Sequence, residues 1–197
     1  MKVAGRPLLN LGAPMNLQFL PLAALLGVAS FAGSHAAPKL DPAGVWLVED
    51  ATARVRIEHC GQPADKICGY LVWAKDPGQG VDALDTKNPD PKKQGRPVVG
   101  AQLILGLAPE EEDHAGSLYN AENGKMYDVK VWRTDATHLI LKGCVMKYLC
   151  QSQTCTKVDD VAPGQLDGPT DGVDGPRADA EWASAPIKVS SAHKMKH

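Results

Sequence analysis

The sequence lacks an excess of charge of one sign, and this absence argues against a nucleic-acid partner. Its 21 lysines and arginines nearly balance 23 aspartates and glutamates, which gives a formal net charge of −2. It also has no long basic run and no zinc-type spacing of cysteine and histidine. Nucleic-acid-binding domains usually carry a basic surface or one of these recognition motifs. We therefore expect no nucleic acid among its partners.

Catalytic motifs are also missing. The chain contains no G-x-S-x-G, no H-E-x-x-H and no phosphate-binding loop. His59, His114 and His138 fall in different candidate strands and loops, and none has a recognisable spacing to a nucleophilic serine or cysteine. We therefore expect a protein that is not an enzyme and that needs no cofactor.

Long apolar runs are scarce, and the one run present lies near the N-terminus. It spans residues 17–31, follows the positive charges of Lys2 and Arg6, and precedes the small-x-small sequence Ser34-His35-Ala36. Positive charge, apolar stretch and small-residue cleavage site, in this order, are typical of a secretory signal peptide. We therefore predict a signal peptide over residues 1–36 and an exported protein, periplasmic or secreted.

A membrane anchor is the alternative interpretation of the same run. A spanning helix needs about 20 apolar residues, whereas this run is shorter and is interrupted by Pro21. Cleavage after Ala36 would leave no stable membrane span. Met15 is an alternative start that would shorten the region before the apolar run.

All five cysteines lie in the exported part of the chain. Export places them in an oxidising compartment, where paired cysteines form disulfides. Cys60 and Cys68 flank one predicted hairpin turn, and Cys144 and Cys150 flank another. Opposed residues of antiparallel strands are close enough to be bridged, so we favour these two local pairs, although other connectivities stay open. Cys155 is then the free thiol, either a reactive nucleophile or redox sensor or, as we favour, a small apolar residue facing the core.

The middle of the chain predicts an all-β domain. Val55 and Ile57 alternate with charged residues, as do Val129 and Val131, and no segment shows a convincing helical period. Eight short strands with local turns favour an antiparallel barrel or sandwich. The candidate strands are residues 45–48, 54–59, 67–74, 102–108, 117–120, 126–132, 138–143 and 151–158.

Three segments between or after these strands are polar. The connection over residues 76–100 is long enough to be a lid or binding loop, and residues 109–116 form a shorter acidic connection. Asn123-Gly124 is a strong hairpin-turn signal. From residue 159 the composition shifts to Asp, Gly, Pro, Ala and Ser. We therefore predict a domain over residues 37–158 and a disordered polar tail over residues 159–197.

Aromatic and amide side chains provide candidate ligand contacts inside the barrel. By alternation, Trp73 groups with the inward residues of its strand and Tyr127 with those of another. Trp46 and Gln153 complete a set suited to a pocket with a few polar contacts. Core packing explains the aromatic residues equally well, so both interpretations stay open.

The long connection contains a second candidate site. Asp85, Asn88 and Asp90 supply oxygen atoms at short spacing, but they lack the pattern of a calcium loop. Asx-Pro turns explain them better, and we expect no metal. Arg96 could hold a carboxylate or phosphate of a ligand, although we favour an ion pair with Asp85 or Asp90.

Several motifs together resemble the bacterial exported family of domain of unknown function 2147. In order, they are Gly44-Val45-Trp46, the stretch 69–73, the Asn-Pro-Asp segment 85–90, the Gly-Arg-Pro-Val-Val-Gly segment 95–100, residues 120–127, Gly143-Cys144 and residues 151–154. The resemblance covers residues 41–158 and implies a lipocalin-like β-barrel without a particular activity. Cys155 and Lys157 depart from it, because the family pattern leads us to expect Trp and Arg there.

The sequence therefore predicts an eight-stranded, lipocalin-like antiparallel β-barrel. By analogy with the fold, we expect a binding module for a small apolar or amphipathic ligand. The alternative is a non-enzymatic structural or interaction protein of the envelope with a filled barrel.

Overall fold

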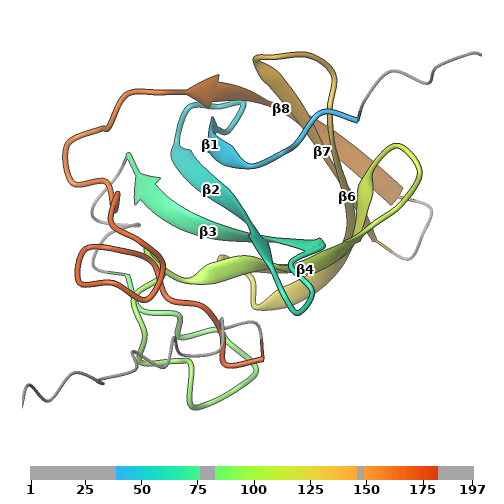
Figure 1. Cartoon of the computed structure of the whole chain (residues 1–197). Coiled ribbons are helices and arrows are strands. Elements are labelled where there is room, and N and C mark those ends of the chain that lie inside the picture. Colours follow the sequence, from blue (N-terminus) through green and yellow to red (C-terminus); the bar gives the residue numbers. More distant parts are fainter. Residues whose placement is uncertain (1–38, 76–82, 146–148, 182–197) are drawn as a thin grey trace, which may run out of the picture. The chain divides into compact units, whose positions relative to one another are not determined.

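The computed structural model describes residues 39–75, 83–145 and 149–181. Within them the chain forms eight strands that close into one antiparallel barrel, each strand pairing with its sequence neighbours and β1 pairing with β8 (Figure 1). The strands are β1 Gly44–Leu47, β2 Ala53–Cys60, β3 Lys66–Ala74, β4 Gln102–Pro109, β5 His114–Asn120, β6 Lys125–Arg133, β7 His138–Val145 and β8 Leu149–Val158. The predicted eight-stranded β-barrel is confirmed. The predicted signal peptide lies outside the described residues.

One end of the barrel is closed by packed side chains. The β2–β3, β4–β5 and β6–β7 turns meet there, and Ile67, Leu107 and Val131 beside them are fully buried. Trp46 joins the same core cluster with 1% of its surface exposed, and its indole Nε1 donates a hydrogen bond to the carbonyl of Pro42 at 2.9 Å. Packing without voids is the usual state of a protein core, so any ligand space must lie toward the opposite end.

A bulge in β3 reverses the expected direction of Trp73. Val55 of β2 pairs with Leu71, but the preceding Arg54 pairs with Trp73, so Val72 is an extra residue on β3. An extra residue shifts the alternation of inward and outward side chains. Arg54 therefore lies over the Trp73 ring, 5.6 Å from its centre, on the outside of the barrel. The prediction that Trp73 points inward is wrong.

β5 is longer than the sequence indicated. It begins at His114 rather than Ser117, because Ala115 and Gly116 already pair with Lys130 and Val129 of β6. The acidic connection is correspondingly shorter than expected. The predicted hairpin turn is confirmed: Gly124 has a φ of +71°, and its amide donates to the carbonyl of Asn120.

Residues 159–181, here called the C-terminal segment, pack on the outside of the barrel. The amide of Leu166 donates to the carbonyl of Val72 at 3.0 Å, and the amide of Arg177 donates to the carbonyl of Gly100 at 2.8 Å. Figure 1 shows this segment in orange and red beside β3. The prediction of disorder is therefore wrong for these residues, while residues 182–197 lie outside the described part.

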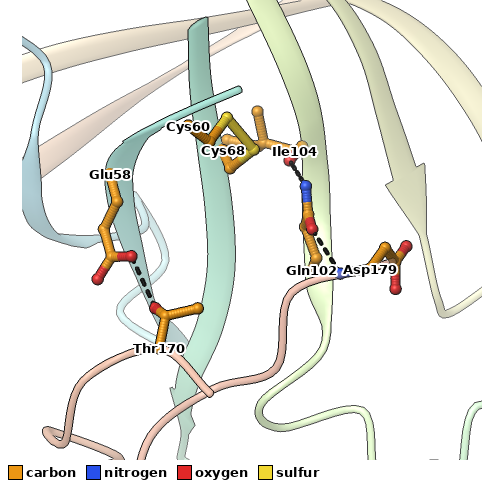
Figure 2. Close-up of a disulfide and its surroundings, with 7 residues drawn as sticks. All are labelled: Glu58, Cys60, Cys68, Gln102, Ile104, Thr170 and Asp179. Atoms are coloured by element: carbon orange, nitrogen blue, oxygen red, sulfur yellow. Dashed lines mark hydrogen bonds between the residues drawn. A yellow bond between two sulfur atoms is a disulfide. The ribbon is translucent and has the colours of Figure 1, made fainter. Parts of the chain in front are cut away.

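The segment is held by specific polar contacts rather than by an apolar stripe. Thr170 donates to Glu58 of β2 at 2.6 Å, and the amide of Asp179 donates to Gln102 of β4 at 2.8 Å (Figure 2). The Gln102 amide nitrogen in turn donates to the carbonyl of Ile104. The low hydrophobicity of the segment predicts disorder. Hydrogen bonds to the barrel nevertheless satisfy its main-chain and side-chain polar groups and hold it in place.

Both predicted disulfides are present. Cys60 is bonded to Cys68 and Cys144 to Cys150, which leaves Cys155 free. Cys144 and Cys150 are directly opposed, whereas Cys68 is opposite Glu58, so the other bridge runs diagonally across its hairpin. The diagonal bridge is on the outer face, yet Cys60 is only 6% exposed and Cys68 is fully buried. Both cysteines belong to a second apolar cluster, against which Leu166 of the C-terminal segment packs.

Candidate ligand cavity

The barrel holds a cavity of about 950 Å³ that lies beyond its packed end and opens to solvent. Aliphatic side chains from opposite walls line it, because inward positions alternate along each strand. The main aliphatic residues are Ile57, Leu71, Ile104, Leu118, Leu139 and Leu141. A cavity of this size and lining falls within the range of small-molecule sites in proteins.

The floor of the cavity is Trp46. This residue lies at the boundary between the packed cluster and the cavity, and it contributes to both. The sequence predicted it as a ligand contact, and the structure places it at the border of the space a ligand would occupy. Whether it contacts a ligand stays a prediction.

Charged and polar side chains gather at the opposite end of the cavity. Asp50 and Thr52 come from the β1–β2 turn, Lys75 from the end of β3 and Glu122 from the β5–β6 turn. The Thr52 hydroxyl donates to the Asp50 carboxylate at 2.6 Å, and this hydrogen bond, with that of the Thr52 amide, lowers the pKa of Asp50. This end is therefore a polar rim, in contrast with the apolar floor.

Gln153 and Cys155 place two polar side chains on the wall between floor and rim. Both lie on the inward face of β8, where Gln153 pairs with Leu141 and Cys155 with Leu139. Cys155 is 4% exposed, and burial, together with the charge of Glu49, raises the pKa of its thiol to about 11. Such a thiol is protonated at neutral pH and therefore a poor nucleophile. This supports the interpretation of Cys155 as an apolar residue of the wall.

Two of the other candidate ligand residues do not line the cavity. Trp73 lies outside the barrel, where its indole donates to the carbonyl of Pro163 at 3.2 Å. Tyr127 packs against the edge of the core cluster, and its hydroxyl accepts a hydrogen bond from Asn123. Neither is among the cavity residues in the described part of the chain, so neither supports the predicted ligand contact.

The loop motif forms a buried polar network beside the cavity. Asp85 is 1% exposed, and it accepts hydrogen bonds from the Tyr119 hydroxyl at 2.5 Å, the Asn88 amide at 2.7 Å and Arg96 Nε at 3.1 Å. Burial and the hydrogen bond to Asp85 raise the pKa of Tyr119 to about 12. Arg96 also pairs with Asp179 of the C-terminal segment at 2.6 Å. The ion-pair interpretation of Arg96 is therefore confirmed for Asp85.

This network fastens the long connection and the C-terminal segment to the barrel. Lys93 forms a second ion pair with Asp179 at 2.7 Å. The buried carboxylate of Asp179 is tolerated because these cations satisfy it. The sequence motif thus positions a loop. Val98 of that loop reaches the cavity lining, so the network shapes the cavity without contributing a charge to it.

The remaining oxygen atoms of the motif form turns. Asn88 Oδ1 accepts from the amide of Asp90 at 2.9 Å, and Asp90 Oδ1 accepts from the amide of Lys92 at 3.0 Å. These are the side-chain-to-backbone bonds of ordinary Asx turns. Among the described residues, no group of three or more histidine, cysteine, aspartate or glutamate side chains could hold a metal ion.

Sequence reasoning missed Tyr119 and the polar rim. Tyr119 borders the cavity and bonds a loop residue 34 positions earlier in the chain, and no local pattern indicates such a contact. Lys75 and Glu122 lie at strand ends, where solvent exposure is the default expectation. The aliphatic lining, by contrast, follows from strand alternation.

A family model described as an uncharacterized protein conserved in bacteria, domain of unknown function 2147, matches residues 44–157. The chain belongs to this family. The match begins at the first strand and ends within the last, so it covers the barrel but not the C-terminal segment.

One solved structure is similar in fold. It is described as protein HP1028 from the human pathogen Helicobacter pylori, which belongs to the lipocalin family. It shares 21% identity with a TM-score of 0.52, and the match covers 61% of this chain and 85% of that one. No match was found among curated proteins. No helix in the described ranges is long and apolar enough to span a membrane.

Proposed function

We propose that this family member is an exported binding protein that carries a small apolar or amphipathic molecule in its barrel. The observation that supports the proposal best is the cavity of about 950 Å³. A barrel serving only as a scaffold would gain stability from filling this space, because each missing contact in a core costs free energy. The cavity therefore favours the carrier over the filled-barrel interaction protein.

Export is the second part of the proposal. The two disulfides hint at an oxidising compartment, since such bonds rarely persist in a reducing cytosol. The signal-peptide pattern of residues 1–36 supports the same location, periplasmic or secreted. The proposal assigns no reaction to the cavity thiol, because its high pKa leaves Cys155 protonated at neutral pH.

A hydrocarbon probe tests the cavity directly. Diphenylhexatriene has no polar atom and fluoresces strongly only in apolar surroundings. We expect the mature, oxidised protein to bind about one molecule per chain with increased fluorescence. Absence of any saturable signal would contradict the carrier proposal.

Position 155 offers a matched pair of variants for this assay. Cys155→Trp places a large ring where the family pattern leads us to expect one, and it would fill part of the cavity. We expect it to abolish or strongly weaken probe binding, while Cys155→Val, which barely changes the volume, leaves it intact. Circular dichroism of both variants shows whether the barrel is kept. Equal binding by two folded variants would mean that the probe binds elsewhere.

A further inference from the structure

Gln153 is a polar side chain of the barrel wall that lies between the floor and the rim and makes no hydrogen bond within the described residues. It lines the cavity on β8. The other polar wall residue at this level, Cys155, has only a weakly polar thiol. The Gln153 amide is not among the buried, unpartnered polar groups of the described residues, so water reaches it in the open cavity. A ligand that displaces this water must supply a hydrogen bond in its place or lose affinity.

The other polar lining residues are already engaged or lie at the rim. Tyr119 donates to Asp85, and Thr52 donates to Asp50. Lys75 and Glu122 extend from the strand ends at the rim, where water can solvate them. None of these groups is placed to bond a ligand atom deep in the barrel.

The surroundings of Gln153 disfavour a charged partner. Its inward neighbours are Leu141, which it faces across the β7–β8 pair, and Leu139 and Cys155 one step toward the floor. One charge lies close to them: the exposed carboxylate of Glu49 accepts a hydrogen bond from the amide of Thr154 at 3.0 Å and contributes to the raised pKa of Cys155. A carboxylate placed there would lose its hydration and be repelled by Glu49, and an ammonium group would lose its hydration for a counter-ion that is exposed to water and therefore screened. The raised pKa of Cys155 is consistent with poor solvation of this wall.

We propose that Gln153 selects a ligand with an uncharged hydrogen-bonding group, such as a hydroxyl, ester or amide, attached to an apolar body that reaches the Trp46 floor. An amide side chain both donates and accepts, so it suits neutral groups of either kind. This inference rests on the proposed carrier function and names the ligand class: neutral amphipathic molecules rather than fatty acids or alkylamines.

The test compares three ten-carbon molecules that differ only in their polar group. Decan-1-ol, decanoate and decylamine compete with diphenylhexatriene at pH 7.5, where the last two are charged. We expect decan-1-ol to displace the probe at the lowest concentration. Tighter binding of decanoate or decylamine would overturn the inference. It would mean that an interaction between the charged group of the ligand and the rim residues determines selectivity.

Two variants on the same strand isolate the amide. Gln153→Leu should weaken decan-1-ol binding about 3- to 10-fold, the effect of one neutral hydrogen bond, and should leave binding of the hydrocarbon probe unchanged. Gln151→Leu makes the same change at an exposed position outside the lining and should alter neither. Thermal unfolding should show that Gln153→Leu is at least as stable as the wild type, since the amide has no partner to lose.

The outcomes separate the two proposals. Wild-type protein that does not bind diphenylhexatriene contradicts the carrier function itself. Normal probe binding with equal decan-1-ol affinity in Gln153→Leu and Gln151→Leu leaves the carrier function standing and overturns the role of Gln153.

Discussion

The guanidinium group of Arg133 lies over the ring of Trp46, 5.5 Å from its centre, at the closed end of the barrel. The same group donates hydrogen bonds to the backbone carbonyls of Asp41, Asp135 and Ala136. One side chain thus joins the segment before β1, the β6–β7 turn and the cavity floor. The planar, multi-donor shape of arginine makes this arrangement feasible, and lysine cannot reproduce it.

Arg133→Lys should destabilise the protein although it keeps the charge. We expect the free energy of unfolding to fall by about 1–2 kcal/mol, from loss of the ring contact and of part of the carbonyl bonding. Urea denaturation monitored by circular dichroism measures it. Arg177→Lys, the same change at an exposed side chain, should stay within about 0.5 kcal/mol. Equal effects would show that the stacked arrangement contributes nothing specific.

The barrel was predictable from the sequence because local sequence patterns indicate its strands and turns. Alternation at Val55 and Ile57 identifies a half-buried strand, and Asn123-Gly124 identifies a turn, without knowledge of any distant contact. The two disulfides were predictable for the same reason, since each bridges the strands of a single hairpin.

Each wrong prediction involves an interaction that cannot be inferred from amino-acid composition or local pattern. Trp73 faces outward because one extra residue, Val72, shifts the alternation, and a bulge depends on the partner strand. The segment after residue 158 appears too polar to order itself, but its order comes from contacts such as Arg56 to the carbonyl of Gly168, more than 100 residues away. The Asp85 network is likewise assembled from three distant parts of the chain.

Leu166 should contribute measurably to stability. It packs against the apolar cluster around Cys68, Tyr70 and Val72, and its amide continues the hydrogen bonding of β3. We expect Leu166→Ala to lower the free energy of unfolding by about 1.5 kcal/mol, less than for a fully buried leucine. Val173→Ala, at a side chain that is 93% exposed, is the control and should change it by less than about 0.5 kcal/mol. A similar loss in both variants would contradict the packing described here.

The two disulfides should be reduced at different rates. Cys60 and Cys68 are buried in the apolar cluster against which Leu166 packs, whereas Cys150 is exposed near the start of β8. Thiol–disulfide exchange requires access to a sulfur atom, so mild reductant should open Cys144–Cys150 first. Alkylation followed by peptide mass mapping identifies which cysteines are modified at each time. Leu166→Ala should accelerate reduction of the buried bond alone, and simultaneous reduction in the wild type would contradict the protection.

Acid should destabilise the protein partly through His114. Burial lowers the pKa of this histidine below its usual value of 6.5, and the positive charge of Lys39 acts in the same direction. His59 adds to the lowering, while Asp41 and Asp113 oppose it. The unfolded chain therefore binds a proton at a pH where the folded protein does not.

This difference fixes the sign of the pH dependence. The contribution of His114 is fully present above its unfolded pKa and is lost as the pH falls through 6.5 toward the lower folded value. We expect the free energy of unfolding to decrease between pH 7 and pH 5, and to decrease less in His114→Leu. His138→Leu, made at an exposed histidine, should keep the decrease. If His114→Leu shows the same decrease as the wild type, acid sensitivity arises elsewhere in the chain.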